Sequence, residues 1–169
     1  MRRRRKGGTP RQGLGRSRGG FTTKIHLRTN GAGLPVALDI APGQGSDYTG
    51  AIPLLDAEGP EPKVLIADRG YDADFIRQEM EARGIAPIIP TRRCRKAQIA
   101  IDGHIYALRN RIERCFNKLK NSRRLATRYD KTAASYLGFV LIAAIRLWTK
   151  AFVNRTQRCY PLSLRVRHF

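Results

Sequence analysis

Residues 64–72 read VLIADRGYD, and this short stretch decides the class of fold. Residues 64–67 are continuously apolar, as in a strand that helices bury on both faces. The run stops at Asp68, where a glycine-containing turn begins. Ligands of α/β proteins bind at the carboxyl ends of such strands, so Asp68 is a candidate site residue. The alternative is that Asp68 caps the turn or pairs with Arg69, and the stretch alone leaves both interpretations open.

The segments on either side extend the α/β pattern. Residues 23–29 alternate between polar and apolar types, and an Asn-Gly turn joins them to a second alternating run at 36–40, which predicts a β-hairpin. His26 falls on the polar face of this hairpin, so we expect it to be exposed. The remaining elements expected are helices at 47–55, 73–83, 104–122 and 133–152 and a strand at 85–89. Their order predicts a mixed α/β domain with helices packed on a partly parallel sheet.

The charge of the chain points to a polyanionic partner. The 169 residues carry a formal net charge of +20, from 33 lysines and arginines against 13 aspartates and glutamates. Basic residues concentrate in 1–24 and 109–169, whereas 25–108 is slightly acidic. Arginine suits phosphate, and nucleic acid is the commonest large polyanion in a cell. We therefore expect nucleic-acid binding, although a solvated surface explains any single cation better.

Several classes of protein are excluded by what the sequence lacks. Cys94, Cys115 and Cys159 lie far apart, without the spacing of a zinc ribbon or of a disulfide-stabilised secreted domain. No apolar run follows the basic start, so no signal peptide is expected. The longest apolar stretch, 137–145, is too short to span a bilayer. We expect a cytoplasmic protein with no membrane partner.

The helix expected at 104–122 carries two stripes. On a helical wheel one narrow stripe holds Tyr106, Arg109, Glu113 and Lys120. The neighbouring stripe is apolar and holds Ile105, Leu108, Ile112, Phe116 and Leu119. The apolar stripe is expected to dock on the sheet, which leaves the polar stripe along its edge. A glutamate among cations suits a metal ligand beside phosphate-binding groups, but surface helices often carry such pairs for modest stabilisation.

Three blocks of this sequence resemble bacterial insertion-sequence transposases of the DDE type. The spacing Tyr106-x2-Arg109-x3-Glu113-x6-Lys120 resembles their Y-R-E-K signature. Residues 67–72 (ADRGYD) look like the strand-end block that carries their second catalytic aspartate. Residues 15–26 (GRSRGGFTTKIH) are similar to the segment that follows their first catalytic aspartate. The blocks occur in the family's order and cover most of the chain.

The resemblance implies an RNase H-like fold, a mixed sheet flanked by helices, over residues 21–152. It implies that Asp68 and Glu113 are the second and third catalytic acids and hold Mg²⁺. Two Mg²⁺ ions held by carboxylates activate a water or a 3′-hydroxyl and stabilise the leaving oxygen. The implied reaction is hydrolysis at transposon ends, followed by strand transfer into target DNA.

The same resemblance assigns the contacts with DNA. Six residues of the matching blocks are expected to bind DNA: Tyr106, Arg109, Lys120, Arg16, Arg18 and Lys24. Residues 1–20 are expected to form a flexible basic arm, because they are too polar to order themselves. Residues 153–169 are expected to form a basic tail.

One catalytic acid of the family has no counterpart. It should precede residue 15, and residues 1–14 contain no aspartate or glutamate. Asp39 is a poor substitute, because it lies on the second arm of the hairpin. The resemblance therefore implies a domain that lacks its first strand and is inactive alone. Such a chain is either a second reading frame joined to the first by frameshifting or the product of a decayed or mis-started gene. Its partners would be DNA, the product of an upstream reading frame and, once complete, further copies of itself. The rival interpretation is a non-enzymatic basic DNA-binding protein or regulator derived from a transposase.

Overall fold

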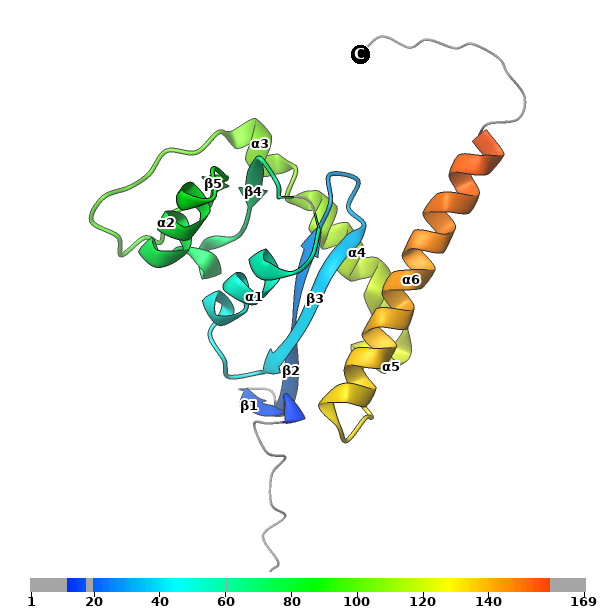
Figure 1. Cartoon of the computed structure of the whole chain (residues 1–169). Coiled ribbons are helices and arrows are strands. Elements are labelled where there is room, and N and C mark those ends of the chain that lie inside the picture. Colours follow the sequence, from blue (N-terminus) through cyan, green and yellow to red (C-terminus); the bar gives the residue numbers. More distant parts are fainter. Residues whose placement is uncertain (1–11, 18–19, 60, 159–169) are drawn as a thin grey trace, which may run out of the picture.

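The structure is a computed structural model that describes residues 12–17, 20–59 and 61–158, and it confirms a mixed α/β chain (Figure 1). The strands are β1 (Gly15–Ser17), β2 (Gly20–Thr29), β3 (Pro35–Pro42), β4 (Val64–Ile66) and β5 (Ala86–Ile88). The α-helices are α1 (Ala51–Asp56), α2 (Asp74–Ala82), α3 (Gly103–Ala107), α4 (Asn110–Lys120), α5 (Arg123–Ala126) and α6 (Ala133–Arg158). Two 3-10 turns, η2 (Asp47–Gly50) and η3 (Arg69–Tyr71), precede α1 and follow β4.

The expected terminal segments fall only partly within the described residues. Of the range 1–20, the structure describes 12–17 and residue 20, and there β1 pairs with the start of β2. Of the range 153–169, residues 153–158 continue α6 and the rest lies outside the described residues. The arm and the tail therefore stay predictions.

The hairpin forms as the alternating pattern predicts. β2 and β3 are antiparallel, with Leu27 opposite Leu38. The side chain of Asn30 shapes the turn by accepting the N–H of Leu34 at 3.0 Å. Gly33 adopts φ +75°, a conformation that side chains disfavour and glycine does not.

The expectation that His26 is exposed is wrong. The residue is only 3% exposed, because η2 and α1 pack over the face of the hairpin that the pattern assigned to solvent. A Cβ atom at Gly50 would overlap the imidazole ring, so the two segments approach as closely as glycine permits. On the same face, Arg28 donates to the carbonyl oxygen of Ala57 at 3.1 Å. Both faces of β2 are therefore covered.

The described strands form two sheets, where the sequence predicts one. β4 and β5 are parallel, with Val64 opposite Ala86 and Ile66 opposite Ile88. The other sheet has the order β1-β2-β3, and the two are not joined by strand pairing among the described residues. The mixed α/β class is confirmed, whereas the continuous mixed sheet is not found.

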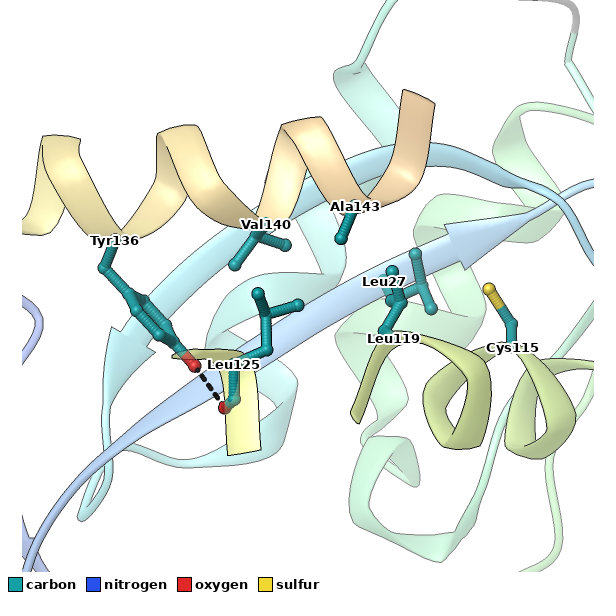
Figure 2. Close-up of a cluster of buried hydrophobic side chains, with 7 residues drawn as sticks. All are labelled: Leu27, Cys115, Leu119, Leu125, Tyr136, Val140 and Ala143. Carbon is teal, nitrogen blue, oxygen red and sulfur yellow. Dashed lines mark hydrogen bonds between the residues drawn. The ribbon is translucent and has the colours of Figure 1, made fainter. Parts of the chain in front are cut away.

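Each sheet has its own apolar core. Ile76, Met80 and Ile89 are fully buried where α1 and α2 pack on β4 and β5. The second core lies between the hairpin and helices α4 to α6, and its buried residues are Leu27, Cys115, Leu119, Leu125, Tyr136, Val140 and Ala143 (Figure 2). The hydroxyl of Tyr136 donates to the carbonyl oxygen of Leu125 at 3.1 Å, which satisfies a buried polar group.

The helix expected at 104–122 is interrupted. α3 ends at Ala107 and α4 begins at Asn110, yet Leu108 and Arg109 keep helical backbone angles. The polar and apolar stripes expected from the helical wheel therefore continue with little change in direction from α3 into α4. Leu108 departs from the apolar stripe, since it is 43% exposed.

Helix α6 is apolar on two faces. Val140 and Ala144 face the core, whereas Ile142 and Ile145 are more than 60% exposed. Residues 133–153 are long and apolar enough to cross a membrane by length and composition, contrary to the expectation from 137–145. One such helix is weak evidence for a membrane span, and this one packs one face against the rest of the protein.

Candidate active site

Asp68 stands at the carboxyl end of β4 and is exposed. Its backbone is extended, with φ −83° and ψ 177°, and its Oδ1 atom accepts the N–H of Gly70 at 2.8 Å. The side chain thus caps η3, which is one of the alternatives that the sequence left open. The ion pairs of the described residues include none between Asp68 and Arg69. Capping engages one carboxylate oxygen and leaves the other available to a ligand.

Glu113 lies in the first turn of α4 with its neighbours in the predicted stripe. Arg109 Nη2 is 2.6 Å from Glu113 Oε1, and the guanidinium lies 5.5 Å from the ring centroid of Tyr106. The side chain of Glu113 is half exposed, so this ion pair adds little stability. Lys120 is exposed and lines a smaller cavity together with Glu113. The structure therefore brings the four residues of the stripe to one side of the helix.

A cavity of about 1050 Å³ between β2 and β4 brings the two acids together. Asp68 and Glu113 both line it, from elements that are far apart in the sequence. Carboxylate oxygens are the ligands that Mg²⁺ prefers, so the pair fits this ion in chemistry. The pair falls short in number, because the described residues contain no group of three or more His, Cys, Asp or Glu side chains placed to hold a metal ion. Asp68 and Glu113 are thus candidates for part of a metal site.

His26 and Tyr71 join the hairpin to the turn that carries Asp68, and the sequence reasoning missed them. His26 Nδ1 lies 3.1 Å from the hydroxyl of Tyr71, which follows Asp68 in η3. Burial, with the carboxylates of Asp68 and Asp47 nearby, raises the pKa of Tyr71 to about 12, so the phenol stays protonated. Burial lowers the pKa of His26 and favours the neutral ring. Neither group carries charge at neutral pH, which suits a fixed hydrogen bond at the wall of the cavity.

The DNA contacts expected from the first block are described only in part. Lys24 Nζ lies 2.7 Å from Asp47 Oδ1 and donates to the carbonyl oxygen of Gly45 at 2.7 Å. Its charge is therefore partly neutralised within the protein. Arg16 lies on β1, but its side chain is outside the described part of the chain, and Arg18 lies outside the described residues.

Asp72 has a structural role beneath the site. Its carboxylate is almost fully buried and accepts from the guanidinium of Arg77 at 3.0 and 3.1 Å, from Arg95 at 3.2 Å and from the N–H of Arg92 at 2.8 Å. Burial alone would raise the pKa of Asp72, but these donors outweigh burial and hold it below its usual value. The network fastens the basic segment 91–98 beside η3. Asp72 does not cap the helix that follows it, since Ala73 is the N-cap of α2.

Comparison with known proteins identifies the family. The family model described as the transposase DDE domain matches residues 2–148. The chain belongs to this family. It is 37% identical over 134 residues to a Brucella ovis protein named as a transposase for insertion sequence element IS6501. This match covers 77% of the present chain and 100% of the relative. It is 31% identical over 128 residues to a Burkholderia cepacia protein named as a transposase for insertion sequence element IS402. This second match covers 70% of the present chain and 58% of that relative. No solved structure matches the chain.

Proposed function

We propose that this chain is the larger part of a DDE transposase catalytic domain that binds transposon-end and target DNA and cleaves and joins it once a third acid is supplied. The observation that carries the proposal is the cavity shared by Asp68 and Glu113. These are the two positions that the family resemblance assigns to catalytic acids. The proposal extends to Mg²⁺ as cofactor and to an RNase H-like sheet completed by a strand from an upstream reading frame.

Each residue of the site has a definable task in this reaction. Bound Mg²⁺ would supply Lewis-acid stabilisation of the attacking and leaving oxygens. Asp68 and Glu113 would hold it with carboxylate oxygens. When Glu113 binds the ion, Arg109 would lose its ion pair with this carboxylate and bind a DNA phosphate instead. A guanidinium suits this role because it binds phosphate through two parallel hydrogen bonds. Tyr106 keeps that guanidinium in place through its ring.

The rival function is a DNA-binding regulator without catalysis. Two facts favour it. The net charge is +20. Counterparts were assigned to only two of the family's three catalytic acids, Asp68 and Glu113, and the described residues contain no group of three or more potential metal ligands. Both functions require DNA binding, and only the first requires the acids. Cleavage in the presence of the product of the upstream reading frame therefore separates the two.

We expect the chain to bind DNA of any sequence in a strongly salt-dependent manner. If three or four of the candidate cations pair with phosphates, the binding constant should fall about 10²-fold between roughly 50 and 200 mM salt. Substituting Arg109→Ala or Lys120→Ala should reduce the slope of log K against log salt by about one each. Lys63→Ala, which lies just before β4 and is not among the residues that line the cavity, is the matched control. Fluorescence anisotropy at several salt concentrations measures these slopes, and a binding constant indifferent to salt contradicts the proposal.

We further expect the chain alone to show no Mg²⁺-dependent cleavage of transposon-end DNA. Two carboxylates provide too few ligands to hold the two Mg²⁺ ions that in-line displacement at phosphorus requires. Gel analysis of labelled end DNA, with the chain alone and with the upstream product added, tests this. Robust cleavage by the chain alone that disappears in Asp68→Ala would refute the requirement for a third acid.

A further inference from the structure

The segment 91–98, between β5 and α3, concentrates positive charge at one edge of the small parallel sheet. It follows the carboxyl end of β5, which lies beside the carboxyl end of β4 because the two strands are parallel. Residues 84–101 contain three arginines, one lysine and no aspartate or glutamate. The connection from β5 to α3 runs along the outside of the unit formed by α2, β4 and β5 (Figure 1). A basic segment therefore lies at the same sheet edge as Asp68.

The first of these cations, Arg92, joins the segment to the turn that carries Asp68. Its Nε and Nη2 atoms donate to the carbonyl oxygens of Arg69 at 3.1 Å and of Gly70 at 3.0 Å. These are the two residues that follow Asp68. The main-chain N–H of Arg92 donates to the buried carboxylate of Asp72 at 2.8 Å. The segment is thus fixed directly against η3.

A second cation and an amide fix the shape of the segment. Arg95 pairs with Asp72 at 3.2 Å and also with Asp74. The side-chain amide of Gln98 donates to the carbonyl oxygens of Arg95 at 2.7 Å and of Arg92 at 3.2 Å, so the loop is closed on itself. A buried carboxylate such as that of Asp72 requires close pairing, and this requirement defines the positions of both arginines.

The other cations of this edge have no partner in the described chain. Arg93 and Lys96 are exposed, and their side chains form no ion pair or hydrogen bond among the described residues. The same holds for the side chain of Arg69 in η3. Three unpaired positive charges are therefore held on an ordered frame beside Asp68.

A solvated surface is the usual explanation of a basic run, and the opposite edge of the same unit argues against it here. At that edge Arg83 forms ion pairs with Asp56 and Glu79, so its charge is balanced within the protein. Only the edge beside Asp68 combines an ordered loop with unbalanced charge. Cations that are already held in place bind a phosphate with a smaller loss of conformational entropy than cations on a flexible loop.

We propose that the segment 91–98 is a preformed binding loop for the sugar-phosphate backbone of duplex DNA, and that Arg93 and Lys96, together with Arg69, bind its phosphates. The inference rests on the proposed function and adds a second set of DNA contacts to those assigned to α4. None of residues 91–98 lines the cavity, so the loop binds DNA outside the place where the bond is cut. DNA held both here and at the stripe of α4 would lie across the two acids.

Cys94 reports contact at this loop without any change to its cations. The thiol is exposed, whereas Cys115 is 1% exposed and burial raises the pKa of its thiol. In a Cys159→Ser chain, we expect a saturating duplex of about 30 base pairs to slow alkylation of Cys94 by iodoacetamide about tenfold, because DNA would cover the thiol and its phosphates disfavour the thiolate. In a chain that also carries Cys94→Ser and Lys63→Cys, the new thiol should react equally with and without DNA. Unchanged alkylation of Cys94 under saturating DNA overturns the proposal.

Charge variants of the loop provide a second measurement. Arg93→Ala combined with Lys96→Ala should reduce the slope of log K against log salt by about two, and should weaken binding about tenfold or more at roughly 100 mM salt. The matched control combines Lys63→Ala, at the amino end of β4, with Arg146→Ala, exposed on α6. It removes the same charge and should leave the slope close to that of the wild type. Circular dichroism checks that both variants are folded, and equal effects of the two pairs overturn the loop.

Failure of the loop and failure of the proposed function give different results. Protection of Cys94 by DNA, without cleavage once the upstream product is added, supports the loop and contradicts the proposed function. Cleavage that depends on Asp68, with Cys94 alkylated equally in the presence and absence of DNA, overturns the loop and leaves the proposed function standing.

Discussion

Replacing Arg77 with methionine is expected to lower the free energy of unfolding by about 3–5 kcal/mol, the usual result of removing one partner of a buried ion pair. Asp72 would then keep its burial and lose its main cationic neighbour, with only Arg95 and the N–H of Arg92 remaining. Methionine preserves much of the volume of the arginine stem, so the loss reports the charge rather than a cavity. Urea unfolding followed by circular dichroism measures the difference.

The response of this variant to pH provides a second test. The pKa of Asp72 in the folded protein lies below its ordinary value of 3.8, so its ionisation stabilises the native state above that pH. This stabilisation disappears as the pH falls through the depressed pKa. In Arg77→Met the buried carboxyl binds a proton more readily, and the gap in stability from the wild type should narrow between neutral pH and about pH 3.

Arg83→Met is the matched control for this pair. Arg83 follows the same helix and forms ion pairs with Asp56 and Glu79, whose side chains are 55% and 40% exposed. Exposed pairs contribute little, so the midpoint of unfolding should hardly move. Equal losses from Arg77→Met and Arg83→Met would show that the buried network does not anchor the segment 91–98.

Local patterns predicted most of the elements, and they singled out the two acids that line the cavity. The strand that ends near Asp68 can be predicted from local sequence alone, because the apolar residues and the glycine-containing turn are adjacent in the chain. The contact between Arg109 and Glu113 follows from helical spacing alone. Even the shared cavity was implied, since the family resemblance made both residues members of one site.

What the sequence could not predict depends on contacts between distant segments. Alternation placed His26 on the polar face of the hairpin, but only the packing of α1 decides that this face is buried. By its position before a helix, Asp72 is a candidate helix cap. Only the fold shows that its carboxylate instead pairs with Arg95, which is distant in the sequence. The separation of β2 from β4 is likewise invisible in either segment, because each is a normal strand by composition. Pairing between strands, unlike their existence, is a property of the whole chain.

The largest effect on function is expected from Asp68→Asn. In an insertion element that encodes this chain in its natural sequence context, transposition should fall about 10³-fold or more. Losing a carboxylate ligand removes several kcal/mol of charge stabilisation in the transition state, and each 1.4 kcal/mol is a factor of ten in rate. Asparagine has the same shape and can still accept the N–H of Gly70, so the turn η3 should persist. A mating-out assay measures the frequency of transposition.

Two comparisons make this loss specific to the site. Glu81→Gln removes one negative charge from an exposed position on α2, outside the cavity, and should leave transposition unchanged. Asp68→Asn itself should bind DNA at least as tightly as the wild type, because it removes a negative charge from the cavity at which Arg109 is proposed to bind a DNA phosphate. Lost transposition with retained DNA binding assigns Asp68 to chemistry. Transposition that survives Asp68→Asn would remove the acid from the site and favour a binding role for the whole chain.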